Sequence, residues 1–229
     1  MISAWGDDDM GSNSGSVYVY DAATGAQLHK LTASDGATND GFGSALALDG
    51  NLLAVGSPGD DDFGSGSGAV YLFDITTGAE LMKLTAADAA ASMGFGGALD
   101  LDGGRLLVGA AGDDSININQ GSAYLFDSGS GAQLMKLLSP NNGNELRFGG
   151  EVALSAGTAL IGAINDSSVG LEGGAAHFYD VTTGNYITEL LPSIGNGDDL
   201  FSWGLDIDGP RAVLSAYRAG SLSRGRGYL

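Results

Sequence analysis

The sequence predicts an all-β fold, a β-propeller built of four-stranded antiparallel blades, and three observations support this prediction. A 53-residue repeat runs through the 229-residue chain without an insertion, as the column Asp7, Asp60, Asp113 and Asp166 shows. Each repeat holds several short apolar runs separated by turn residues, and repeats of about 40–50 residues with several short strands are typical of propeller blades. No segment has the length and periodicity of a helix.

Further columns keep the same spacing. One closes a run rich in tyrosine and phenylalanine, one supplies a turn glycine, and one supplies a leucine. Their members are Asp21, Asp74, Asp127 and Asp180; Gly25, Gly78, Gly131 and Gly184; and Leu31, Leu84, Leu137 and Leu190.

One repeat resolves into four strands. The first, residues 42–48, alternates between leucines and alanines and ends at Asp49-Gly50, a pair that favours a tight hairpin turn. The second, residues 52–55, is apolar at every position, which predicts burial on both faces. A polar loop over residues 57–68 leads to the aromatic third strand, residues 69–73. The fourth, residues 80–84, mixes charged and apolar residues, as expected of a half-exposed edge strand that contains a bulge.

The phase of the repeat predicts a single propeller domain over residues 1–229, with about four to five blades. A partial blade covers residues 1–37, full blades begin near residues 42, 95 and 148, and a second partial blade covers residues 201–229. Because the last residues repeat the phase of the first, we expect an open segment of a larger propeller rather than a closed ring.

Composition excludes several classes of function. The net charge is −19, from 28 acidic and nine basic residues, which argues against a nucleic-acid partner and against anionic membrane surfaces. No window is apolar enough for membrane insertion, and no signal peptide is visible. Cysteine is absent, which excludes disulfides and cysteine–zinc sites.

Phe-Gly begins the blades at residues 42, 95 and 148, and the third strand begins with the pattern at residues 15–21, Gly-Ser-Val-Tyr-Val-Tyr-Asp. These motifs resemble the FG-GAP repeat of integrin α subunits, in a form similar to its bacterial subtype. The resemblance implies a seven-bladed parent propeller, an extracellular or cell-surface location, and binding rather than catalysis. The family's calcium loop between strands one and two is not matched here, because a two-residue turn offers one carboxylate and Ca²⁺ needs six to eight oxygen ligands.

More than half of the acidic residues fall on one face. In an antiparallel meander, the loops between strands two and three share a face with the loops between blades, and these two sets hold most of the aspartates. Lys30, Lys83 and Lys136 belong to the outer strands. The resemblance implies that this acidic loop face binds ligands.

Adjacent carboxylates in these glycine-rich loops form the candidate metal site, with Ca²⁺ as the candidate cofactor. Its residues are Asp7, Asp9, Asp60, Asp62, Asp113 and Asp114. The alternative is that aspartate and glycine form turns in which the first aspartate caps loop amides.

The histidines and two of the aromatic residues are expected to have no role in catalysis or metal binding. His29 and His177 occupy different columns and have no paired histidine or cysteine, so neither is expected to bind a metal or act as a general base. Trp5 and Tyr217 are expected to pack between blades.

The sequence therefore predicts a non-enzymatic extracellular binding or adhesion module, which presents its acidic loop face to a protein or glycan ligand and binds divalent cations weakly. A propeller-type enzyme, a lyase or a quinoprotein, is the alternative, and it would need a blade-specific cluster of His, Arg, Tyr or Glu near the central channel. A purely structural spacer is the third reading.

Overall fold

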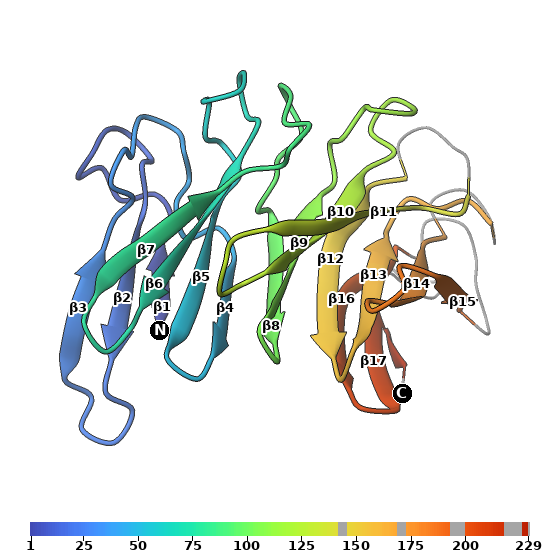
Figure 1. Cartoon of the computed structure of the whole chain (residues 1–229). Coiled ribbons are helices and arrows are strands. Elements are labelled where there is room, and N and C mark those ends of the chain that lie inside the picture. Colours follow the sequence, from blue (N-terminus) through green and yellow to red (C-terminus); the bar gives the residue numbers. More distant parts are fainter. Residues whose placement is uncertain (142–145, 169–172, 193–199, 218–225, 229) are drawn as a thin grey trace.

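The computed structural model describes residues 1–141, 146–168, 173–192, 200–217 and 226–228, which form five antiparallel sheets (Figure 1). We call these sheets blades A to E. Blade A consists of β1 (Ile2–Ala4), β2 (Ser16–Tyr20) and β3 (Gln27–Leu31), and blade B of β4 (Leu46–Asp49), β5 (Leu52–Ser57), β6 (Ala69–Asp74) and β7 (Ala79–Leu84).

Blade C consists of β8 (Ala98–Asp102), β9 (Arg105–Ala110), β10 (Ser122–Asp127) and β11 (Gln133–Leu138). Blade D consists of β12 (Phe148–Ser155), β13 (Thr158–Ala163), β14 (Ala175–Asp180) and β15 (Tyr186–Leu190), and blade E of β16 (Phe201–Asp208), β17 (Arg211–Ala216) and β18 (Arg226–Tyr228). The four-stranded blades have the strand order of the predicted meander.

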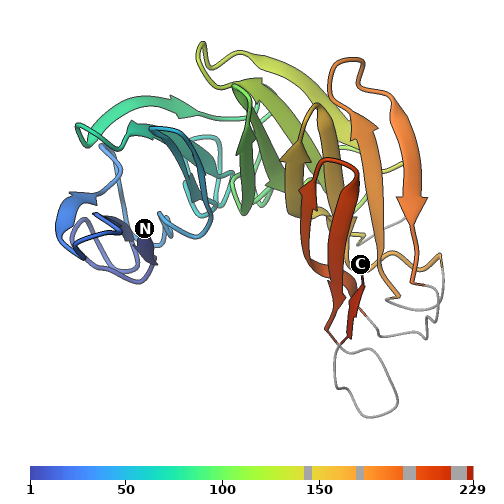
Figure 2. The ribbon, with the colours of Figure 1, turned by 90° about the horizontal axis from the view of Figure 1, so that it is seen from below.

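The blades stand side by side in an arc that is open between blades A and E (Figure 2). The first strands of successive blades, β4, β8, β12 and β16, pack against one another along the inside of the arc. In the described part of the chain no strand of blade E pairs with one of blade A. The predicted propeller architecture is confirmed, and no described helix is long and apolar enough to cross a membrane.

The second and third strands of each blade form its core. In blade B, Leu53, Ala54 and Val55 are completely buried, as the continuous apolar run predicts, and so is Tyr71 of β6. The outer strands are partly exposed, and their pairing with the third strand shifts register once in each of blades A to D. This shift is the bulge predicted from the mixed pattern.

The Phe-Gly dipeptide joins neighbouring blades. The Phe95 ring inserts into its own blade, edge-on to Tyr124 and Phe126 at centroid distances of 5.5 and 5.8 Å. Its backbone crosses Gly68 of blade B, where Phe95 N–H donates to Ser67 C=O at 3.2 Å. Gly68 has φ +83°, and a β-carbon there would overlap with the Phe95 carbonyl oxygen. The phenylalanine of this motif therefore packs its ring into the core of its own blade, while its backbone packs against the preceding blade.

The turn between strands one and two closes on residues 50–51, because Asp49 pairs with Leu52. Asp49 is thus the last residue of β4, and the prediction that it forms part of the two-residue turn is wrong. Its carboxylate accepts a hydrogen bond from Gly103 N–H of blade C at 3.1 Å, and the Asp102 carboxylate accepts one from Ala156 N–H of blade D at 2.8 Å. These aspartates connect neighbouring blades at the face opposite the acidic loops.

The prediction that Trp5 and Tyr217 pack between blades is wrong. Their side chains are 60% and 56% exposed. Tyr217 instead stacks on Trp203, with a centroid distance of 5.0 Å and an interplanar angle of 26°.

Candidate functional site

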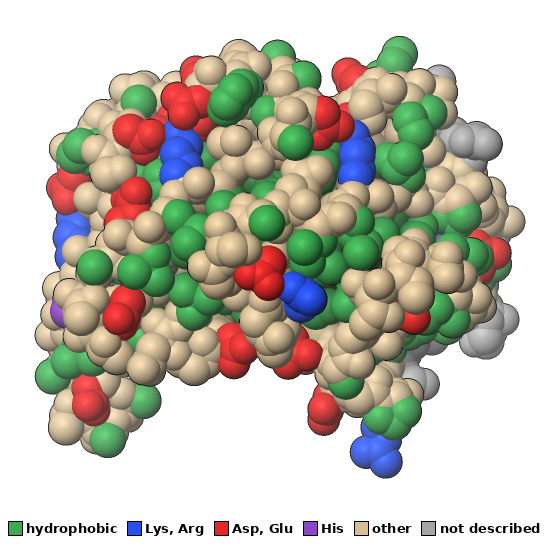
Figure 3. Space-filling view, in the orientation of Figure 1, with side chains coloured by type: hydrophobic (Ala, Val, Ile, Leu, Met, Phe, Trp, Pro, Cys, Tyr) green, Lys and Arg blue, Asp and Glu red, His purple; other side chains and the backbone are tan. Residues whose placement is uncertain are grey.

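The loops between strands two and three and the loops between blades lie together along one face of the arc, at the top of Figure 1. In the space-filling view, acidic side chains gather there beside lysines (Figure 3). We call this surface the acidic loop face. It arises because each strand reverses direction, which places every second connection on the same side.

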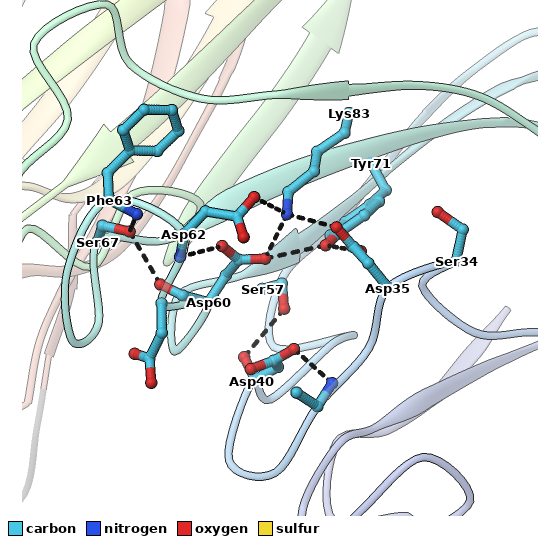
Figure 4. Close-up of polar contacts among 12 residues, drawn as sticks. Ser34, Asp35, Asp40, Ser57, Asp60, Asp62, Phe63, Ser67, Tyr71 and Lys83 are labelled. Carbon is cyan, nitrogen blue, oxygen red and sulfur yellow. Dashed lines mark hydrogen bonds and ion pairs between the residues drawn. The ribbon is translucent and has the colours of Figure 1, made fainter.

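Three carboxylates, two from blade B and one from the loop between blades A and B, surround the Lys83 ammonium of blade B (Figure 4). Lys83 Nζ lies 2.8 Å from Asp35 Oδ2, 2.8 Å from Asp60 Oδ2 and 2.6 Å from Asp62 Oδ2. The Tyr71 hydroxyl lies 2.7 Å from Asp35 Oδ1 and 3.0 Å from Asp60 Oδ2, so its single proton serves both carboxylates. Asp60 is buried, whereas Asp35 and Asp62 are about half exposed. The ammonium group thus occupies the point where these carboxylates would hold a cation.

Blade C repeats this arrangement. Lys136 Nζ lies 2.6 Å from both Asp88 Oδ2 and Asp113 Oδ2, and it donates to Ser115 Oγ at 2.9 Å. The Tyr124 hydroxyl lies 3.0 Å from Asp88 Oδ1.

Blade A has the same kind of pair. Lys30 forms ion pairs with Asp7, at 3.1 Å, and with Asp9. Although the three lysines start on the outer strands, as predicted, their ammonium groups end in the acidic loops. Sequence reasoning missed this, and the signal was the lysine column, which keeps the same 53-residue spacing as the aspartate column.

The electrostatics of these clusters follow from the ion pairs. Hydrogen bonds from the Lys30 ammonium and the Ser16 hydroxyl lower the pKa of Asp7 to about 2. Burial alone would lower the pKa of Lys83, but hydrogen bonds to Asp35, Asp60 and Asp62 outweigh it and raise that pKa above its ordinary value. Burial, followed by the hydrogen bond to Asp35, raises the pKa of Tyr71 far above its usual range. Lys83 and Tyr71 therefore both keep their protons at neutral pH.

The structure separates the six predicted metal residues into groups. Asp60 and Asp62 come together with Asp35, which the sequence reasoning did not include, and the oxygens of these three lie within 4.8 Å of one another. Asp7 and Asp9 share Lys30, and Asp113 pairs with Lys136. Asp114 lies apart from Lys136, whose third contact is Ser115.

The first aspartate of each loop also forms the turn that was predicted as the alternative to metal binding. One carboxylate oxygen accepts a hydrogen bond from the N–H two residues later, in all four loops. These aspartates are Asp7, Asp60, Asp113 and Asp166.

The second aspartate of three loops behaves differently. Asp8, Asp61 and Asp114 each accept a hydrogen bond from the backbone N–H five residues later, and all three are exposed. No described lysine or arginine forms an ion pair with any of them. This column carries negative charge that the clusters do not neutralise.

A pocket at the junction of blades C, D and E breaks the regularity of the repeat. It is lined by Ala111, Arg147, Gly150, Glu151, Ile164 and Trp203. Arg147, Glu151 and Trp203 stand where the other repeats have small residues, and the one exception is Leu200 in the column of Arg147. Burial raises the pKa of Glu151. The sequence reasoning missed this pocket, although these departures from small-residue columns were visible.

We expect the lysine clusters to make the free energy of unfolding decrease at acid pH. Burial raises the pKa of Asp113, but hydrogen bonds from its neighbours, Lys136 above all, lower it overall. A carboxylate whose folded pKa is lowered stabilises the fold above its unfolded pKa of about 4 and loses that effect as pH falls through the folded value. Asp113→Asn should therefore cost about 2 kcal/mol at neutral pH and progressively less below about pH 4.

Urea unfolding of wild type and variant between about pH 7 and about pH 3 measures this difference. The matched control is the neighbouring exposed Asp114→Asn, which should change the free energy of unfolding by less than about 0.5 kcal/mol. A cost for Asp113→Asn that stays constant over this pH range would contradict the ion-pair explanation.

Comparison with known proteins agrees with the repeat architecture. The model of a family described as FG-GAP repeat matches residues 26–73, 79–126 and 132–179, in three consecutive copies that together cover more than half of the chain. Comparison with curated proteins finds no significant match.

Proposed function

Because the chain belongs to the FG-GAP repeat family, we propose that it is a non-enzymatic extracellular module that binds a partner protein through its acidic loop face. The supporting observation is the exposed column of Asp8, Asp61 and Asp114, which occurs once in each of blades A, B and C and forms no ion pair with the described residues. Carboxylates at one-blade intervals on a rigid arc suit a partner with basic residues at several points. This charge favours a basic protein segment over a glycan ligand.

Calcium is a secondary part of the proposal. At Asp7 and Asp9, at Asp60 and Asp62, and at Asp113, a lysine ammonium and a cation would compete for the same carboxylates. We therefore propose that Ca²⁺ binds these loops only weakly, and that wild-type partner binding does not need it.

A lysine- and arginine-rich peptide is the probe for the acidic loop face. Its affinity should fall with rising salt, because exposed charges are screened. Replacing Asp8, Asp61 and Asp114 together by asparagine keeps the side-chain acceptor for the loop amide and removes three charges. At about 0.2–1 kcal/mol per exposed pair, the dissociation constant should rise about tenfold, measured by titration calorimetry at low salt.

The matched control removes three charges from the opposite face. Asp21, Asp74 and Asp180 cap turns there, and asparagine can form the same turns. This triple variant should bind the peptide with nearly wild-type affinity. Equal loss in both variants would show that net charge, rather than the acidic loop face, attracts the peptide.

The specific observation that favours the enzyme alternative is the blade-specific pocket, since Arg147 and Glu151 lie close to the inner strands. The described lining supplies one acid, one cation and the Trp203 indole, without histidine or tyrosine. This set suits binding of a partner side chain better than lyase or quinoprotein chemistry. We therefore assign the pocket to recognition within the same proposal.

A further inference from the structure

Blade D carries a changed version of the lysine clusters. Where blade C has Asp88, Tyr124 and Lys136, blade D has Asn141, His177 and Glu189 at the same repeat positions. The loop aspartate and serine are retained. We call this set the blade D cluster, and its residues are Asn141, Asp166, Ser168, His177 and Glu189.

The changes leave two carboxylates without a cation. Glu189 replaces the lysine, and in the described part of the chain no lysine or arginine forms an ion pair with Asp166 or Glu189. The neutral Asn141 amide takes the place of the ammonium, with Nδ2 2.9 Å from Asp166 Oδ2, 3.3 Å from Ser168 Oγ and 3.5 Å from Glu189 Oε2. Asp166 is buried, and its described side-chain partner Asn141 is neutral. A buried carboxylate without a cation is costly.

The second observation is the state of His177. Its side chain is completely buried, and neither ring nitrogen has a hydrogen-bond partner among the described residues. It faces Glu189 directly across the β14–β15 ladder. It also occupies the column of Tyr71 and Tyr124, whose hydroxyls reach the loop carboxylates.

An imidazole is shorter than a phenol and lacks the hydroxyl with which Tyr71 and Tyr124 reach the loop aspartates of their blades. Burial lowers the pKa of His177 more than the negative charges of Asp166 and Glu189 raise it, so the ring is neutral and keeps a lone pair. A fully buried imidazole with no partner on either nitrogen calls for a bound water or ion.

We propose that the blade D cluster binds a divalent transition-metal ion such as Zn²⁺, with the His177 imidazole and the Asp166 and Glu189 carboxylates as ligands. Imidazole with carboxylates suits zinc, whereas Ca²⁺ takes oxygen ligands alone. Two carboxylates also balance the charge of the ion. The expectation that His177 plays no metal role rested on the missing second histidine, and the pairing with Glu189 supplies the partner that spacing in the sequence does not reveal.

Binding needs a rearrangement of the side chains. Among the described residues, Asp35, Asp60 and Asp62 are the only such set whose ligand atoms already lie within 4.8 Å of one another. In blade D, Glu189 is half-buried, and it must turn from Asn141 toward the ring. This site lies within the blade, and its occupancy does not depend on whether the acidic loop face binds a partner.

The test is titration of ZnCl₂ into the full chain, with a thermal melt in the presence and absence of the metal. We expect saturable binding of one ion per chain and a higher Tm. The double variant His177→Tyr/Glu189→Lys restores the tyrosine and lysine that blade C has at these positions. It should fold at least as well and lose the zinc response.

Two single variants keep the result interpretable if the double variant fails to fold. Glu189→Gln retains the shape of the ligand and should weaken zinc binding by more than the ~10–100-fold that outer-shell changes cost. His29→Ala removes the other histidine and should leave binding unchanged. The proposal is overturned if wild type shows no saturable zinc binding, if Glu189→Gln binds like wild type, or if His29→Ala abolishes the response.

Discussion

Gly68→Ala is expected to destabilise the chain by about 3 kcal/mol or more, one of the largest effects available to a single methyl group in this fold. Gly68 has φ +83°, where an alanine is strained, and its β-carbon would overlap with the backbone of Phe95 in the next blade. Because the obstacle is backbone, relief requires blades B and C to separate. Urea unfolding monitored by far-UV circular dichroism, which reports on all blades, measures the loss.

Gly103→Ala is the control for backbone conformation alone. Gly103 also has positive φ, +56°, but a β-carbon there meets nothing within 4 Å. One repeat later the chain itself has Ala156, at φ 48°. This variant should cost no more than about 1 kcal/mol. Equal costs for Gly68→Ala and Gly103→Ala would show that φ, and not the contact between blades, makes these glycines necessary.

The second large effect is expected from Lys83→Met. The substitution removes the ammonium that neutralises Asp35, Asp60 and Asp62 and leaves Asp60 buried without it. Removing one partner of a buried ion pair costs about 3 kcal/mol, which for a chain of this size lowers Tm by about 10 °C. Since three carboxylates then face each other, Ca²⁺ should restore much of the lost Tm.

Lys136→Met is the matched variant for the calcium response. It should be destabilised in a similar way, but only two carboxylates, Asp88 and Asp113, surround its position. Its Tm should therefore rise less with CaCl₂. If Lys83→Met melts at the same temperature with and without calcium, the carboxylates do not form a latent cation site. Strong saturable calcium binding by wild type would show that the lysine does not compete.

The period of the repeat was sufficient to predict the blades, because both the strand pattern and the turn glycines recur in it. The buried second strand and the bulged outer strand could also be predicted, because a continuous apolar run indicates burial and a mixed charged and apolar run indicates an edge strand. The Phe-Gly motif marked the start of each blade. Its contact with Gly68 could not be predicted, because that approach depends on how one blade packs on the next.

The candidate site was less predictable for a physical reason. Residue type and strand position locate the Cα of Lys83, but the charge sits at the end of a long side chain. Asp35 lies 48 residues before this lysine, in a loop that varies between blades, so no local spacing joins the two. His177 was set aside because metal motifs are usually recognised from paired ligands on one segment, whereas Glu189 reaches it across a strand ladder.

The contacts made by Phe-Gly and by Asp49 and Asp102 join each blade only to the next one. A chain of this kind approximates a one-dimensional array, in which stability is a sum of blade terms and nearest-neighbour coupling terms. Opening should then start at blades A and E, which have one neighbour each, and advance inward blade by blade. Amide hydrogen exchange should accordingly be slowest in β9 and β10 of the central blade C and fastest at the two ends of the arc.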